Sequence, residues 1–328
     1  MKDATGRWSL WSNPAEFTAG PFDPSLFSSQ LVISEIMYHA PDPSPAESAA
    51  AAALNPPQSW NDDSFDYLEL RNISTTTIDL AGFQLTSGVD FVFPQGTAVA
   101  PGASILIVAN PDAFNARYGP GKPIAGSWDP NDRLNNSGET LTLQFGSLLP
   151  PVFSFAYSDD RLPDWPASAD GEGSSIVRIR PEDASLDPSL GHNWRASLAP
   201  NPGSDDRTRY SDWLAGGSEP DANGNGIPNA LEYMLGPNAA NSPATSIASL
   251  TVNGQTADYM TLSLRLLNGR EDFRHTAQFS PSTDTWPFAG TLVSVTDNRD
   301  GSRTEIWRAP NPISQGSRLF GRFRFQSQ

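Results

Sequence analysis

The chain has 328 residues, a formal net charge of −16 and no cysteine. With Lys2 and Lys122 as its only lysines, it lacks the clustered basic groups of a nucleic-acid-binding surface. The missing cysteines exclude disulfides, thiolate metal sites and a cysteine nucleophile.

The length predicts two or three domains at roughly 150 residues each. The chain has 26 Gly and 30 Pro and is 10% aromatic, a composition that indicates short strands joined by loops. No apolar run is long enough to span a bilayer, so we expect no membrane span. The first twenty residues lack an apolar signal-peptide core.

Residues 1–30 begin with a short alternating segment, Arg7 to Ser12, which predicts a half-buried strand. The Gly- and Pro-containing residues 20–24 follow and predict a loop. A lone strand with two tryptophans cannot bury them by itself, so we expect this segment to be the end of a truncated domain.

From Leu31 onward, short apolar or alternating runs recur about every 8–15 residues, with Gly, Pro and Asn between them, as in a β-sandwich. Short helices are predicted around residues 46–54 and over Pro111 to Tyr118, where Phe114 and Tyr118 are four apart and Gly119-Pro120 follows. The predicted strands are 31–38, 65–71, 78–80, 83–85, 91–93, 104–109, 140–145, 153–157 and 175–179.

Residues 205–244 are predicted to be a linker that carries one metal-binding motif. Residues 221–232 match the calcium-loop pattern D-x-[DN]-x-[DN]-G-x5-E at every fixed position. Gly226 permits the sharp turn, and residues 229–235 would form the helix that leaves the loop. The alternative is an Asn-Gly turn without metal. The predicted Ca²⁺ ligands are Asp221, Asn223, Asn225, Ile227 through its carbonyl, Asn229 and Glu232.

The composition changes near residue 240, which is the first sign of a domain boundary. Residues 1–239 carry 12 basic and 30 acidic groups, net −18, and residues 240–328 carry 9 and 7, net +2. Six alternating runs in residues 245–328 predict a second small β-sandwich with solvent-facing arginines. The strands are predicted at 249–252, 259–266, 273–279, 291–295, 304–307 and 319–325, with a tight turn at 297–303.

Eight stretches of residues 31–204 occur in the order and spacing of one known domain. They are residues 33–39, 66–72, 78–85, 93–97, 101–108, 134–143, 165–166 and 173–176. Through these stretches, residues 31–204 resemble the lamin-tail domain as found in large secreted bacterial proteins. The resemblance implies an immunoglobulin-like β-sandwich, with residues 41–60 as an insertion.

The flanks resemble other modules of such proteins. Residues 6–18 resemble the last strand of a fibronectin-like module. The loop at 221–232 is similar to dockerin and thrombospondin type-3 loops. Residues 245–328 resemble C-terminal β-domains of Verrucomicrobia- and Planctomycetes-type surface proteins. These resemblances imply a fragment of a longer exported protein.

Catalytic arrangements are disfavoured. Glu35 and Glu69 lie in strands that could face one another, but a structural role is preferred over a glycosidase pair. The acidic residues 62, 63, 66 and 69 are interpreted as a solvated edge, with a second cation site as the alternative. The three histidines are scattered, without a metalloprotease or hydrolase motif. Trp165 and Trp194 are interpreted as core residues, although exposed aromatics could bind sugars.

The sequence therefore predicts an all-β chain, with an Ig-like sandwich and a smaller C-terminal sandwich joined by a calcium-loop linker. We expect a monomeric, non-enzymatic, secreted or cell-surface segment that acts in adhesion or as a spacer that positions neighbouring domains. The alternative is a carbohydrate-binding module. The expected partners are Ca²⁺ and an extracellular polysaccharide or cell-surface protein.

Overall fold

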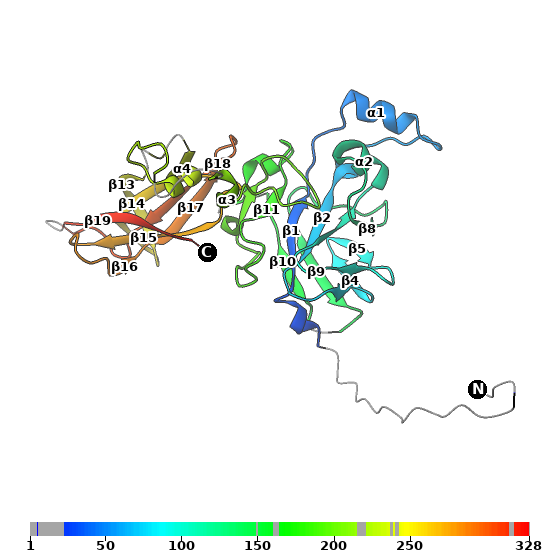
Figure 1. Ribbon diagram of the computed structural model, residues 1–328, viewed down its shortest axis with the longest axis horizontal. Coiled ribbons are helices and arrows are strands. Elements are labelled where there is room, and N and C mark those ends of the chain that lie inside the picture. Colours follow the sequence, from blue (N-terminus) through cyan, green and yellow to red (C-terminus); the bar gives the residue numbers. More distant parts are fainter. Residues whose placement is uncertain are drawn as a thin grey trace.

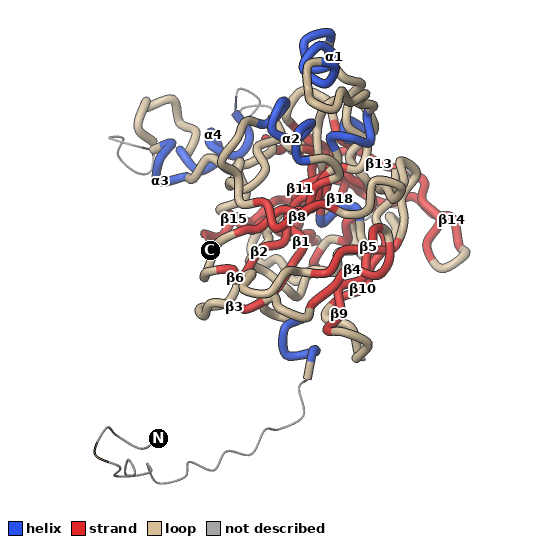
Figure 2. Tube along the Cα trace, turned by 90° about the vertical axis from the view of Figure 1, so that its right-hand side faces the viewer, coloured by secondary structure: helices blue, strands red, loops and turns tan. Residues whose placement is uncertain are grey.

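The computed structural model describes residue 5 and residues 23–148, 150–159, 164–214, 221–236, 239, 243–314 and 318–327. Two β-rich lobes follow one another along the chain (Figure 1), with the second viewed partly behind the first in Figure 2. The strand predicted at residues 7–12 lies outside the described residues. Among those described, no helix combines the length and apolar character that crossing a membrane requires.

The first lobe contains two sheets that face each other. The larger has the strand order β12-β11-β1-β2-β7-β8, and the smaller has β10-β9-β4-β5. A two-stranded ladder, β3-β6, lies beside them. The strands are β1 (Leu31–Met37), β2 (Tyr67–Asn72), β3 (Ile78–Asp79), β4 (Phe83–Ser87), β5 (Val89–Val92), β6 (Ala98–Val99), β7 (Ser104–Val108), β8 (Ile124–Ser127), β9 (Thr140–Phe145), β10 (Phe153–Ala156), β11 (Ile176–Arg178) and β12 (Trp194–Ala196).

One apolar core fills the space between these sheets. Side chains from β1, β2 and β7, among them Ile36, Leu68 and Ile107, contact aromatic residues of the smaller sheet. Trp194 is fully buried and stacks near Trp165 at a ring-centroid distance of 6.2 Å. The core includes residues from Leu31 to Trp194. The predicted single sandwich and the core roles of both tryptophans are therefore confirmed.

Two helices cover the outer face of the larger sheet near one end. They are α1 (Pro45–Ala52) and α2 (Pro111–Tyr118). The first begins one residue before the helix predicted around residues 46–54 and ends two residues earlier, and the second has the predicted range. Since side chains alternate along a strand, the residues next to the core positions point outward, and Phe114 of α2 packs there against Tyr67. Arg117 joins the helices through an ion pair of 2.8 Å to Glu47.

The second lobe is a smaller sandwich. One sheet has the order β13-β14-β18-β17 and the other has β16-β15-β19. Each predicted strand of residues 245–328 corresponds to an observed strand, and only the two-residue β16 was not predicted. The strands are β13 (Ala244–Val252), β14 (Gln255–Leu267), β15 (Phe273–Ser280), β16 (Phe288–Ala289), β17 (Thr291–Asp297), β18 (Ser302–Arg308) and β19 (Phe320–Ser327).

The expectation that the arginines of the second sandwich face solvent is wrong for Arg303, whose side chain is only 6% exposed. Arg303 pairs with Leu266 of β14 across the sheet, and Glu305 pairs with Leu264. Both leucines point into the core, and paired residues share a face of the sheet. The inner positions of β18 therefore carry charged side chains.

Residues between the two sandwiches form the helices α3 (Tyr210–Trp213) and α4 (Asn229–Leu235). Tyr233, Met234 and Leu235 of α4 are buried and share a hydrophobic cluster with Leu264 and Phe273. The domain boundaries at 204 and 245 stay predictions, but α4 packs on the second sandwich. The 3-10 helices of the chain are Pro24–Phe27, Asp62–Phe65, Ala167–Ala169 and Gly191–Asn193.

Candidate functional site

The loop predicted to bind calcium is closed around the carboxylate of Asp221. One oxygen of Asp221 accepts from the backbone N–H groups of Gly224 and Asn225 at 2.8 and 3.2 Å. The other accepts from the N–H of Gly226 at 2.8 Å. Gly224 and Gly226 have φ values of 70° and 83°, which glycine adopts without strain. The glycines thus allow the backbone to wrap around the first predicted ligand.

Glu232 lies on the first turns of α4 and reaches back to the same loop. It accepts from the side-chain amides of Asn223 at 3.0 Å and Asn225 at 2.7 Å. The amide oxygens of these residues accept from backbone N–H groups within the loop. A cation bound here would require each amide to turn its oxygen inward, because only oxygen ligates Ca²⁺.

Hydrogen bonds thus connect four of the six predicted ligand residues, Asp221, Asn223, Asn225 and Glu232. Ile227 of the same loop donates its backbone N–H to Asn225 at 2.8 Å. Asn229 has a different arrangement: it is 1% exposed, and its amide oxygen accepts from the N–H of Ala222 at 2.9 Å. That bond ties the start of the loop to the start of α4. Among the described residues, no group of three or more His, Asp or Glu side chains is arranged to hold a metal, so a cation here would depend on the asparagines.

Helix α4 fixes the loop to the second sandwich. The hydroxyl of Tyr233 donates to Asp272 at 2.9 Å and to the carbonyl of Thr208 at 2.5 Å. Burial, together with the hydrogen bond to Asp272, raises the pKa of Tyr233 above its ordinary value. The loop is therefore anchored at its C-terminal end on a packed helix.

The two sandwiches share a buried ionic interface. Arg195 of β12 has a side chain with no exposed area, and it pairs with Asp206 at 2.5 Å and with Glu271 at 3.0 Å. Glu271 also pairs with Arg303 at 3.3 Å. Burial opposes the charge of Arg195, but the carboxylates of Glu271 and Asp206 raise its pKa above the ordinary value. Arg195 is therefore a permanent charge that needs both carboxylates.

A second set of interface hydrogen bonds involves β17. The hydroxyl of Ser168 donates to Asp297 at 2.6 Å, and the backbone N–H of Ser168 donates to the same oxygen at 2.9 Å. Asp164 accepts from the N–H of Val295 at 2.7 Å. These bonds link the loop around residues 164–169 of the first sandwich to one strand of the second.

The charged residues of the interface between the sandwiches were not predicted from the sequence. Glu305 lies in the strand predicted at residues 304–307, whereas Arg303 was assigned to the turn before it. In the observed β18 the two residues stand two apart, and this spacing places them on one face. Charges at two successive positions of one face usually indicate the solvated side. Arg303 and Glu305 are interior because the first sandwich covers the end of the second sandwich on which they lie.

Glu35 and Glu69 do lie directly opposite each other on β1 and β2. They are 5% and 3% exposed, so a substrate cannot reach them. Glu35 accepts from the hydroxyls of Tyr67 and Ser175, both at 2.5 Å. Burial, helped by the charge of Glu69, raises the pKa of Glu35 to about 8. The arrangement is that of a protonated acid inside a hydrogen-bond network.

Each histidine lies beside a carboxylate of its own. His39 contacts Asp170 at 2.7 Å, His192 contacts Asp164 at 3.3 Å, and His275 contacts Glu305 at 2.6 Å. The three pairs belong to different parts of the fold. In the described part of the chain, these contacts join each histidine to a carboxylate and not to a Ser or Thr hydroxyl.

Two facing sheets, aligned across a core that spans residues 31–194, give the first sandwich an Ig-like architecture. Residues 27–147 match the family model of the lamin tail domain. The lamin-tail match ends after β9, whereas β11 pairs with β1 in the middle of the larger sheet. The sandwich that contains the matched residues therefore extends beyond them.

The comparison with curated proteins and the comparison with solved structures give no match. The family match concerns a non-catalytic type of domain.

Proposed function

We propose that this chain is a non-catalytic, extracellular spacer or adhesion segment that holds its neighbouring domains at a fixed angle. The observation that supports this proposal is the buried Arg195, which is bound by carboxylates on both sides of the junction between the sandwiches. Domains joined by a flexible linker normally share small, polar and exchangeable contacts. A buried charge network tolerates only a narrow range of relative positions, because a displaced partner would leave a charge buried and unpaired.

The proposal predicts a narrow distribution of distances between the sandwiches. The chain has no cysteine, so Val92→Cys and Ile247→Cys would place one label on each sandwich. Both residues are on the surface, 63% and 65% exposed. Pulsed electron spin resonance should give one narrow distance peak, and adding Arg195→Met should broaden it. A broad distribution in the doubly labelled parent would rule out a fixed angle.

We further propose that the loop at residues 221–232 binds one Ca²⁺ and stiffens the segment before α4. The convergence of Asp221, Asn223, Asn225 and Glu232 supports this assignment. Two carboxylates and two amides supply oxygen ligands of the kind that Ca²⁺ prefers. Because only two ligands are charged, we expect a dissociation constant in the roughly 0.1–1 mM class of extracellular sites.

Calorimetric titration with CaCl₂ tests the loop directly. Asp221→Ala and Glu232→Gln should abolish the heat of binding, while Asp258→Asn, an exposed acid outside the loop, should leave it unchanged. At about tenfold excess over the dissociation constant, the gain in stability is only about 1.4 kcal/mol. No heat at millimolar calcium, or equal heat in all variants, would return the loop to a plain Asn-Gly turn.

A carbohydrate-binding module is the second candidate, and one surface feature favours it. Trp213 is 37% exposed and lies parallel to Tyr210, with 18° between the ring planes. Exposed aromatic faces bind sugar rings by stacking. Trp213→Ala should remove binding on a glycan array, whereas Trp286→Ala should not, because Arg322 already covers the Trp286 ring at 4.3 Å. If the chain binds no glycan on the array, carbohydrate binding is ruled out and the spacer function is the remaining candidate.

A further inference from the structure

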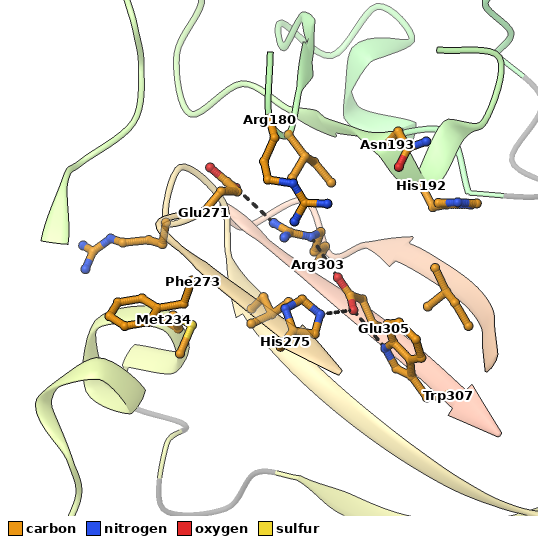
Figure 3. A pocket seen from close by; sticks show the side chains of 14 residues that line it. Arg180, His192, Asn193, Met234, Glu271, Phe273, His275, Arg303, Glu305 and Trp307 are labelled. Carbon is orange, nitrogen blue, oxygen red and sulfur yellow. Dashed lines mark hydrogen bonds and ion pairs between the residues drawn. The ribbon is translucent and has the colours of Figure 1, made fainter. Parts of the chain in front are cut away.

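A cavity of about 240 Å³ lies at the junction of the two sandwiches. The first sandwich contributes the wall around Arg180 and His192, and α4 contributes Met234. The second sandwich contributes the inner face of β18 and the start of β15, including His275 and Trp307. Figure 3 shows Arg180 reaching from the first sandwich towards Arg303, with Glu305 and His275 beyond it. The cavity is the open end of the second sandwich, closed by the first.

The carboxylates that line this cavity already have cationic partners. Glu305 contacts His275 at 2.6 Å, the indole N–H of Trp307 at 2.9 Å and Arg303 at 3.4 Å. Glu271 is held by Arg303, and also by Arg195 behind the cavity wall. The lining thus contains three arginines against two glutamates, an excess of positive charge in a chain of net charge −16.

Of the lining arginines, Arg270 and Arg180 form no ion pair with a described carboxylate. Arg270 donates to the carbonyl of Tyr233 at 3.1 Å instead, so the cation left for a ligand is Arg180. Its Nε is buried without a hydrogen-bond partner. The acidic residues that follow it in sequence are engaged elsewhere: Glu182 pairs with Arg207 at 3.1 Å, and Asp183 pairs with Arg274 at 3.1 Å. Burial, and then the nearby charge of Arg274, lowers the pKa of Arg180. The charges of Asp183 and Glu182 still favour its protonated form. A guanidinium that forms no ion pair of its own and lies near other arginines is a ready partner for an anion.

We propose that this cavity binds a single anionic group, a carboxylate or a sulfate, with the Arg180 guanidinium as its main contact. The partly buried rings of Trp307 and Phe273 line the same cavity and would contact the apolar part of a ligand. The volume is below that of pockets for drug-sized molecules, roughly 300–1,000 Å³, so the bound group would be no larger than one acidic sugar ring. This inference is independent of the calcium loop.

Because the cavity is lined by both sandwiches, a bound anion would contact both. It would pair with Arg180 of the first sandwich while lying against the β15 and β18 residues of the second. Such a ligand would therefore also favour the closed junction over a separated one, since a ligand that binds only one state stabilises that state.

Calorimetric titrations with three probes test the proposal on the intact chain. The probes are sodium glucuronate, sodium sulfate and glucose, each up to tens of millimolar in a buffer of constant ionic strength. Binding of glucuronate alone would indicate a carboxylate on a sugar ring, and binding of both salts would indicate a general anion site. Either result supports the proposal. Binding of none of the probes, or of glucose as tightly as glucuronate, would overturn it.

Variants assign the effect to the cavity. Arg180→Gln should weaken binding of the responding anion at least tenfold, and Arg180→Lys should recover part of it. Arg133→Gln removes the same charge from a side chain that is 73% exposed and should not change the affinity. Equal affinity in Arg180→Gln and the parent would also overturn the proposal.

A stability measurement separates ligand binding from a structural role. Arg180 forms no ion pair with a described carboxylate, so Arg180→Gln should leave the melting temperature of the ligand-free chain unchanged or slightly higher. Leu292→Trp provides a second variant, because it keeps every charge but fills space in the cavity, whose lining includes Leu292. It should also abolish binding, and unaltered binding in a folded Leu292→Trp chain would place the anion elsewhere.

Discussion

The two sandwiches fill their interiors in different ways. The first sandwich has one large apolar cluster between its sheets, rich in Trp, Phe, Leu and Ile, and two helices over its outer face. The second sandwich has two smaller apolar clusters, and its end towards the first is filled by Arg303, Glu305 and His275. A large apolar core can stabilise a domain on its own, whereas a charged end becomes buried only when a second surface packs against it. The comparison suggests that the second sandwich depends on the first more than the reverse.

The largest effect should come from the core of the first sandwich. Trp194→Ala removes a fully buried indole that also donates to the carbonyl of Pro188 at 2.8 Å. We expect a loss of up to about 5 kcal/mol in the free energy of unfolding, from the cavity and the lost transfer energy. Calorimetric melts should show both sandwiches destabilised. Trp213→Ala, at a partly exposed position, serves as the control and should cost clearly less.

A substitution in the core of the second sandwich tests whether the first sandwich also depends on the second. Phe279→Ala empties a fully buried position of the second sandwich, again at a cost of about 3–5 kcal/mol. If the comparison holds, the first sandwich still melts at a temperature close to that of the parent. An equal loss of both sandwiches would show that the dependence is mutual.

The next largest effect on stability is expected from the ion pairs of Arg195 at the junction between the sandwiches. Arg195→Met leaves Asp206 and Glu271 without their shared cation, and breaking one partner of a buried pair costs about 3 kcal/mol or more. We expect the transition of the second sandwich to separate from that of the first and to move to lower temperature. Adding Glu271→Gln to Arg195→Met should recover part of the loss. No recovery would mean that Arg195 acts mainly by packing.

The two sandwiches should also differ in their pH dependence. Burial and then Glu69 raise the pKa of Glu35 in the first sandwich to about 8. Its folded state holds a proton that the unfolded state loses above about 4.5, so its contribution to stability falls as the pH rises from about 4.5 to 8. The steepest slope from one such group is about 1.4 kcal/mol per pH unit.

Glu305 of the second sandwich has the opposite shift. Burial alone would raise its pKa, but His275 and Arg303 lower it to about 2. Its contribution is present above about pH 4.5 and is lost as the pH falls towards 2. Urea titrations of Glu35→Gln, which keeps an acceptor for Tyr67 and Ser175, should show a flatter alkaline side and an unchanged acid side. An unchanged slope above pH 5 would mean that Glu35 is ionised in the folded chain.

The smallest effect is expected at the edge of the second sandwich. Ile247 of β13 is 65% exposed, so Ile247→Thr removes little buried surface and keeps a β-branched residue. The free energy of unfolding should change by less than about 0.5 kcal/mol. Thermal melts of this variant provide the baseline for the larger effects above. A loss above about 1 kcal/mol would show that β13 contributes to the core more than its exposure indicates.

Sequence alone established most of the local structure. The ranges of α2 and α4 are as predicted, because Pro at the start, Gly at the end and the 3–4 spacing of apolar residues act within one turn. The strands β6, β8 and β12 were not predicted. They have two to four residues, too few to show an alternating pattern. The predicted ligands Asp221 and Glu232 were assigned to one loop because the motif fixes their spacing along one short stretch of chain.

What the sequence determined by itself is the all-β class, the order of the two sandwiches and the closed loop before α4, since these follow from patterns within about ten residues. What only the tertiary structure decided is the location of the charges. Arg195, Glu271 and Arg303 are distant in sequence, and their positions become interior only when one sandwich covers the end of the other. The alternation of side chains along a strand distinguishes the two faces of a sheet. Which face is buried depends on where another part of the chain packs against it. For the same reason the cavity beside Arg180, whose walls come from both sandwiches, has no signature in any single stretch of the chain.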